Sequence, residues 1–339
     1  MPKHYLPTLL LFLIFSSSIA QQRAQYSQYM FNSYIINPAW SGMEDYIDLK
    51  SGYRNQWVGV EGAPKTFYIA GNAALDKSDR TSSLSVRGPN GRPLARSKVF
   101  RSQQHFPDHN GIGAIFLRDE TGPSSRTTFD ITYAHHFVLT NFLKLSTGIS
   151  AGVTQHTLDF DKLQLLEPND PLSGYGKLSK IVPDINAGAL LYSANFYVGA
   201  SVNQLLFKKL NYGFNGTSDY EWLGRLYNHY FLTAGYRFDI SNDFALLPSA
   251  MVKSVRPTPV SFDLNLKALF QDRVWLGASY RHKDAIVGLI GVNVNYLLNI
   301  GYSYDFTFSN LSTVSKGTHE IVISLMLANR QRILCPRLF

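Results

Sequence analysis

The feature that most constrains this chain is an alternation of apolar and polar residues that repeats along most of its length. Between residues 260 and 270, for example, apolar residues at the even positions alternate with Ser261, Asp263 and Asn265. Successive side chains of a strand point to opposite faces, so this period of two predicts strands with one apolar and one polar face. About fourteen such segments follow one another, beginning near residues 47, 65, 110, 125, 142, 183, 196, 227, 243, 260, 274, 285, 297 and 318.

Two uncharged stretches, 185–207 and 285–304, are each long enough for a membrane-spanning helix. Their glycines, asparagines and period of two instead predict two hairpins, with strands of about nine residues that could cross a bilayer when tilted. We therefore expect an all-β protein, a transmembrane antiparallel outer-membrane β-barrel of about 14 strands. An even number of strands suits a barrel that closes without an exposed edge. A soluble secreted β-sandwich is the alternative, since its strands would alternate in the same way.

Aromatic residues make up 14% of the chain, against 17% charged residues. In a barrel, such residues form girdles at the two membrane interfaces. Tyrosines that fall on the expected strands are assigned to these girdles: Tyr53, Tyr68, Tyr133, Tyr192, Tyr236, Tyr280 and Tyr302.

The N-terminus has the features of a secretory signal peptide. Lys3 precedes an apolar run over residues 9–15, and Ser18 and Ala20 supply small residues for cleavage. We therefore expect a signal peptide at 1–20, an N-terminal periplasmic or plug segment at 21–45, the barrel at 46–328 and a basic tail at 329–339. The single Cys335 excludes an internal disulfide.

The connections between the expected strands alternate in length. Those after even-numbered strands are tight, which places them on the periplasmic side if the N-terminus is periplasmic. One exception is a long insert at 77–109 with seven basic and two acidic residues. Basic docking candidates in the insert and the tail are Arg87, Arg92, Arg96, Lys98, Arg101, Arg330, Arg332 and Arg337. The insert has few aromatic residues, so it does not resemble a nucleic-acid platform, and no nucleic acid is expected as a partner.

No catalytic pattern withstands inspection. Residues 148–152 match the G-x-S-x-G pattern, but the alternation continues through Ser150, whereas a nucleophile elbow needs a sharp strand-to-helix turn. His319-Glu320 lacks the second histidine of a zinc-protease helix. His135 and His136 point to opposite faces of a strand and cannot chelate one metal. We expect no enzyme, no metal and no cofactor.

Three blocks are more specific. Residues 25–32 (QYSQYMFN) with 36–42 (INPAWSG), residues 53–66 (YRNQWVGVEGAPKT), and residues 317–321 (GTHEI) resemble the PorP/SprF family of type IX secretion and gliding proteins. The family's signature falls on Tyr29, Met30, Asn37, Pro38, Gly42, Arg54, Gln56, Trp57, Gly59, Gly62, Pro64, Lys65, Gly317, Thr318, His319 and Glu320. Each position also has a structural interpretation, such as a turn in a plug for Asn37-Pro38 or an ion pair in the lumen for Arg54.

The resemblance implies a non-enzymatic barrel in the outer membrane, in contact with its lipid. It also implies support for the export or surface anchoring of large adhesins with C-terminal sorting domains. The implied periplasmic partners are lipoproteins linked to peptidoglycan and components of the trans-envelope motor. From the residues alone, a channel or a transporter for hydrophobic solutes remains the alternative, because a barrel of this size could leave an open lumen.

Overall fold

The computed structural model describes residues 26–75, 108–140, 142–162, 176–206, 226–255, 258–308, 314–329 and 334. Nearly all of the regular structure is strand. The strands are β1 (Ile47–Asn55), β2 (Lys65–Leu75), β3 (His109–Thr121), β4 (Ser124–Thr140), β5 (Leu143–Asp159), β6 (Lys177–Tyr192), β7 (Phe196–Asn203), β8 (His229–Tyr236), β9 (Phe238–Asp239), β10 (Phe244–Val255), β11 (Ser261–Phe270), β12 (Val274–Arg281), β13 (Ala285–Asn293), β14 (Leu298–Thr307) and β15 (Thr318–Leu327).

Three short 3-10 helices complete the described part: η1 (Ser33–Ile35), η2 (Pro38–Trp40) and η4 (Phe160–Lys162). None of the helices in the described ranges combines the length and apolarity that crossing a membrane requires.

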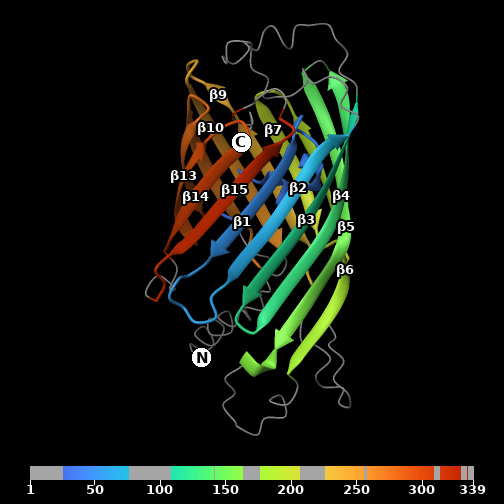
Figure 1. Ribbon diagram of the computed structural model, residues 1–339, viewed down its shortest axis with the longest axis vertical. Coiled ribbons are helices and arrows are strands. Elements are labelled where there is room, and N and C mark those ends of the chain that lie inside the picture. Colours follow the sequence, from blue (N-terminus) through green and yellow to red (C-terminus); the bar gives the residue numbers. More distant parts are fainter. Residues whose placement is uncertain are drawn as a thin grey trace, which may run out of the picture.

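Strands that follow one another in the sequence pair with one another in antiparallel fashion around the whole sheet. The circle is complete because β1 pairs with β15, which places the blue first strand beside the red last strand in Figure 1. β8 and β9 both pair with β10 in the same register, so they count as one strand of the wall that is interrupted at Arg237. The described residues therefore form a closed antiparallel barrel of 14 strands, which confirms the expected fold and the approximate strand number. The largest difference is in β6, which begins at Lys177 rather than near residue 183.

The two faces of the wall differ as the alternation predicts. In β4, Asp130 and Thr132 are buried toward the lumen, whereas Ile131 on the outer face is 60% exposed. A lipid bilayer would cover such an outer face. Five of the tyrosines assigned to the girdles are exposed on the outer face, which a girdle requires: Tyr53, Tyr133, Tyr236, Tyr280 and Tyr302. The assignment is wrong for Tyr68 and Tyr192, which are buried in the lumen, where they pack in the cluster built around the N-terminal segment described below.

The barrel has two different ends. One end carries most of the short connections, such as 193–195 and 271–273, and is called the turn end here. The other end, called the loop end, carries the β1–β2 loop at 56–64. β4, β5 and β6 have 17, 17 and 16 residues, about twice the 8 residues of β12, and extend below the rest of the wall at the loop end in Figure 1.

Candidate functional site

The lumen is filled by the N-terminal segment. Every residue from Ser27 to Glu44 is buried, and we call residues 27–44 the plug. Ser27 lies beside Arg54 near the loop end, and Gly42 lies beside Asn72 near the turn end, so the plug runs through the barrel from one end to the other. The N-terminal segment was expected either in the periplasm or as a plug, and its described residues lie in the lumen as a plug.

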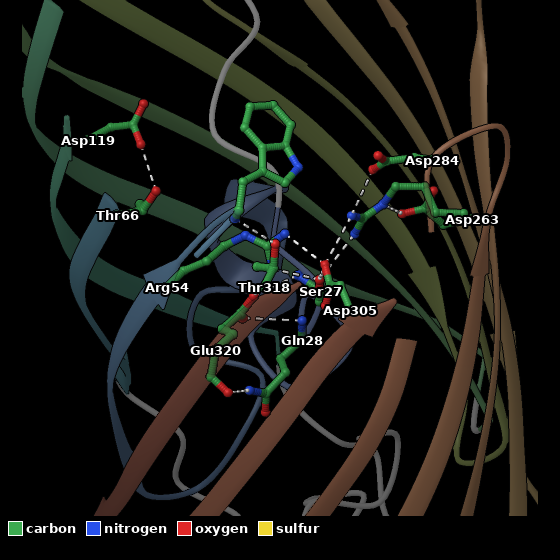
Figure 2. Close-up of polar contacts among 12 residues, drawn as sticks. Ser27, Gln28, Arg54, Thr66, Asp119, Asp263, Asp284, Asp305, Thr318 and Glu320 are labelled. Carbon is green, nitrogen blue, oxygen red and sulfur yellow. Dashed lines mark hydrogen bonds and ion pairs between the residues drawn. The ribbon is translucent and has the colours of Figure 1, made fainter. Parts of the chain in front are cut away.

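The loop end of the plug is held by a cluster of buried charges (Figure 2). The Arg54 guanidinium lies 2.8 Å from carboxylate oxygens of both Asp305 and Glu320, and it donates to the Ser27 hydroxyl at 2.7 Å. Glu320 also accepts hydrogen bonds from the backbone N–H groups of Ser27 and Gln28. These side chains are at most 3% exposed, and removing charges from water at this depth is favourable only when they are paired and hydrogen-bonded.

A second arginine extends the cluster across the lumen. Arg281 pairs with Asp263 and Asp284 at 3.3 Å each and with Asp305 at 3.5 Å. Asp305 therefore links the two arginines, as the dashed lines in Figure 2 show. The charges of this cluster therefore pair with one another, and the pairs of Arg54 join β1 to β14 and β15, which are distant from it in the sequence.

The middle of the plug is shaped by Asn37-Pro38. The Asn37 side chain accepts from the Ala39 N–H at 2.9 Å and so caps η2, and Pro38 occupies the first helical position, where its missing N–H has no cost. The Asn37 amide also donates to the carbonyls of Ala189 and Ala200. This single side chain thus turns the plug and attaches it to β6 and β7.

Aromatic residues fill the remaining space around the plug. Trp40 packs edge-on against Tyr197 with ring centroids 4.9 Å apart, and Phe31 packs against Trp275 at 5.9 Å. The Tyr29 hydroxyl accepts a hydrogen bond from the Asn265 side chain of β11. Met30, the next residue of the plug, is also buried. The lumen therefore resembles a protein core more than a water-filled channel.

The turn end of the plug is held by backbone contacts. Gly42 has φ +77°, and a side chain there would meet the Gly111 Cα at 2.4 Å. A glycine is therefore needed on both counts. The neighbouring carbonyls of Ser41 and Gly42 lie 2.8 and 3.1 Å from Nε2 of His136 and His109, whose rings stack at 4.3 Å.

The second signature block forms the loop at 56–64. Gln56 N–H bonds the Pro64 carbonyl and closes the loop, and Trp57 N–H donates to the Thr318 hydroxyl. Positive φ angles at Trp57, Gly59 and Gly62 fold it, and Gly62 accepts from Gly122 N–H. The opposite side of the loop bonds the third block through Val58 and Gly317. The two blocks therefore build one cross-linked rim at the loop end.

This rim borders a cavity of about 870 Å³. Its lining is mixed in charge, with Glu61, Lys65, Glu120 and Lys162 among the side chains. No three His, Cys, Asp or Glu side chains of the described ranges are grouped so that they could hold a metal ion. Ser150 of the G-x-S-x-G pattern lies within the straight run of β5 and accepts a hydrogen bond from Asn186.

The signature residues thus separate into three places. The plug contains Tyr29, Met30, Asn37, Pro38 and Gly42; the wall beside its loop end contains Arg54, Thr318 and Glu320; and the rim contains Gln56, Trp57, Gly59, Gly62, Pro64, Lys65 and Gly317. His319 differs, because it lies on the outer face, where its Nδ1 is 2.7 Å from the Tyr302 hydroxyl. The eight basic docking candidates in the insert and the tail lie outside the described residues.

Sequence reasoning missed several residues that hold the plug. His109, His136 and Thr132 of the wall contact it directly, and Thr132 accepts a hydrogen bond from the hydroxyl of Tyr34 in the plug at 2.8 Å. The available signal was position: each of the two wall histidines falls on the polar face of its strand, where a side chain must meet the lumen.

A closed β-barrel with a lipid-facing exterior and a polar, plugged interior defines a membrane protein of the outer-membrane class. The sequence pattern of the family described as "Type IX secretion system membrane protein PorP/SprF" matches residues 18–325. The chain belongs to this family, and it is an outer-membrane β-barrel of the type IX secretion system. A search of curated proteins finds no match to the chain.

Among solved structures, the chain is similar to the toluene transporter TbuX of Ralstonia pickettii, with 9% identity, a TM-score of 0.49, and coverage of 88% of this chain and 93% of that one. It is also similar to a FadL homologue of Pseudomonas aeruginosa, with 12% identity, a TM-score of 0.48, and coverage of 88% and 92%. The outer membrane protein Omp33 of Acinetobacter baumannii shares 10% identity at a TM-score of 0.45, with coverage of 85% and 100%.

Proposed function

We propose that this protein is a non-enzymatic component of the type IX secretion and gliding apparatus that supports the export or surface anchoring of large adhesins with C-terminal sorting domains. The observation that carries the proposal is where the signature residues of the family lie in the structure. Nearly all of its positions build a filled lumen and a cross-linked rim, with no reaction centre among the described residues. Rigid, hydrogen-bonded loops at the end of a barrel suit docking of a protein partner.

The proposal assigns the loop end to the cell surface and the turn end to the periplasm. Outer-membrane barrels keep their short turns in the periplasm, and the tight connections at 193–195 and 271–273 fit this orientation. Cleavage of the signal peptide after Ala20 would release the segment that enters the lumen. The basic insert at 77–109 and the tail at 329–339 would then face periplasmic lipoproteins and motor components, to which their positive charge is suited.

A deletion strain tests the proposal. Adhesins that carry a C-terminal sorting domain should be made at normal levels but should be lost from the cell surface, as measured by antibody labelling of intact cells. Re-expression of the full chain should restore the labelling. Normal surface labelling in the deletion strain would reject the proposal.

A solute channel is supported less well by the geometry. A gap beside the plug, lined by Tyr26, Asp263 and Arg281 among others, has a volume of about 40 Å³, which is room for a few water molecules. Steady conductance of the purified full chain in planar bilayers, with porin-like amplitude, would favour the channel over the plugged docking barrel.

A further inference from the structure

The outer face of β4, β5 and β6 changes from apolar to polar toward the loop end. On β4, Ile131 and Phe129 are 60% and 47% exposed, and Thr127 is the next outward residue in that direction. The same change follows Val153 on β5 and Ile181 on β6. Beyond these apolar residues, the outer face carries five neutral side chains that can form hydrogen bonds, which we call the polar patch: Ser125, Thr127, Gln155, Thr157 and Ser179.

The register of the strands brings these five side chains together. Thr127 lies opposite Gln155, and Thr157 lies opposite Ser125 on one side and Ser179 on the other. Side chains opposite each other on one face of an antiparallel pair have Cβ atoms about 4.5–5.5 Å apart. The Gln155 amide donates to the Ser179 hydroxyl at 2.7 Å, and the hydroxyls of Thr157 and Ser179 lie 3.2 Å apart. The polar patch is therefore one continuous surface across three strands.

The polar patch is open on its outer side. Gln155 and Ser179 are exposed, and Ile181, which lies opposite Gln155, is 62% exposed. A molecule outside the barrel can therefore reach the side chains of the patch.

The charged side chains at the borders of the patch are paired. Arg118, opposite Thr127, lies 2.6 Å from a carboxylate oxygen of Glu120. Lys177, at the tip of β6, lies 3.4 Å from a carboxylate oxygen of Asp159. The patch and its borders therefore offer neutral donors and acceptors and balanced charges, which suit a hydroxylated ligand better than a strongly charged one.

The position of the patch determines which layer of the membrane meets it. Two successive outward residues of a strand lie about 7 Å apart, and the headgroup layer of a bilayer is about 5–8 Å thick on each side. The patch spans two outward positions on both β4 and β5, directly beyond the apolar face that lipid covers. β4, β5 and β6 extend farther at this end than the rest of the wall (Figure 1). The patch therefore lies at the level of the lipid headgroups.

We propose that the polar patch binds the sugar headgroup of the lipopolysaccharide that surrounds the barrel. Serine and threonine hydroxyls and the glutamine amide both donate and accept hydrogen bonds, as sugar hydroxyls do. The bond between Gln155 and Ser179 already orders both side chains, which lowers the entropy lost on binding. A protein partner would instead use aromatic or arginine anchors, and none of the five residues of the patch is of that kind.

This inference rests on the proposed function, because it uses the orientation assigned there, with the loop end at the cell surface. In an outer membrane, lipopolysaccharide forms the leaflet on that side. The ligand is therefore the lipid that is already next to the wall.

The test compares two lipids by native mass spectrometry of the purified full chain in detergent. Rough lipopolysaccharide carries a core oligosaccharide, whereas free lipid A has the same acyl anchor without the core. The ratio of their dissociation constants therefore isolates the contribution of the sugars. We expect the unchanged protein to prefer lipopolysaccharide at least tenfold, and T127A/Q155A/T157A/S179A to lower that preference to within threefold of equality.

Thr147→Ala is the matched control, because Thr147 is an exposed outward threonine of β5 nearer the turn end. This variant should keep the full preference for lipopolysaccharide. Resistance to unfolding in SDS without heating checks that each variant is folded. Q155A/S179A changes fewer wall residues, and it should lower the preference at least threefold if the larger variant does not fold. An unchanged preference in a folded patch variant, or no preference in the unchanged protein, overturns the inference.

The deletion strain separates the two proposals. If adhesin display is lost on deletion but the patch variants keep the preference for lipopolysaccharide, the proposed function stands and the sugar site is rejected. If display is normal on deletion while the patch variants lose the preference, the proposed function fails and the sugar site stands.

Discussion

Replacing Arg54 with leucine should release the loop end of the plug while the barrel wall stays closed. Arg54 is the only group drawn in Figure 2 that contacts Ser27, Asp305 and Glu320 together. Its loss leaves both carboxylates buried, and the described contacts then give Asp305 one cation, Arg281 at 3.5 Å, and Glu320 none. Breaking a buried ion pair by removing one partner costs about 3–5 kcal/mol, because the remaining charge stays away from water.

Hydrogen exchange measured by mass spectrometry can isolate this effect. Amides of the plug exchange through local release, so a loss of about 3–5 kcal/mol should speed their exchange by roughly a hundred- to several-thousandfold at 1.4 kcal/mol per factor of ten. Amides of the ladder between β4 and β5, which contains no residue of the cluster, should keep their protection. The R54L/E320L pair should lose less than the sum of the single variants, because leucines at both positions remove the unpaired charge.

The control is Arg118→Leu. Arg118 forms an ion pair with Glu120 at 2.6 Å, but the two side chains are 55% and 43% exposed. Exposed pairs contribute about 0–1 kcal/mol, so this variant should leave the exchange of the plug within a few-fold of the unchanged protein. If R54L also left the plug within threefold, the cluster would not hold the plug, and the reasoning would be refuted.

Three further outcomes follow from the same geometry. Gly42→Val should displace the turn end of the plug, because its side chain would overlap Gly111; a cysteine at Ala39 in a C335S background should then react with maleimide much faster than in the Gly42 protein. Leu266→Arg should lower the free energy of unfolding in lipid by about 2–4 kcal/mol, measured by urea titration, because Leu266 is 49% exposed on the outer face. Removal of residues 27–44 should turn a silent barrel into a conducting one in planar bilayers, and continued silence would show that the plug is not what closes the lumen.

The strands of this fold could be predicted because lipid imposes a rule on every one of them. Wherever the wall crosses the bilayer, one face must be apolar, and the period of two is then visible, as at Ile131 between Asp130 and Thr132. The rule stops where the wall leaves the lipid. Lys177–Lys180 form the first part of β6 without an apolar outer face, so the sequence predicted a loop there.

The interior was less predictable for a related reason. A water-filled lumen and a plugged lumen both require polar wall residues, so the pattern alone could not separate them. Arg54 was expected either to pair or to bind a partner, and its actual partners come from β14, β15 and the plug, which are brought together only by closure of the barrel. The same ambiguity placed Tyr68 and Tyr192 in the girdles, because an aromatic residue on a strand does not reveal which face it occupies until the register is known.

The path of the plug has a consequence for the order of biogenesis. The plug precedes β1 in the chain, yet Ser27 and Gln28 are bonded to Glu320 of β15, the last strand to leave the ribosome. Arg54, which completes those contacts, belongs to β1, the strand that β15 must meet to close the wall. The contacts at the loop end of the plug are therefore complete only when the first and last strands meet, so a barrel that lacks its final hairpin would also lack them.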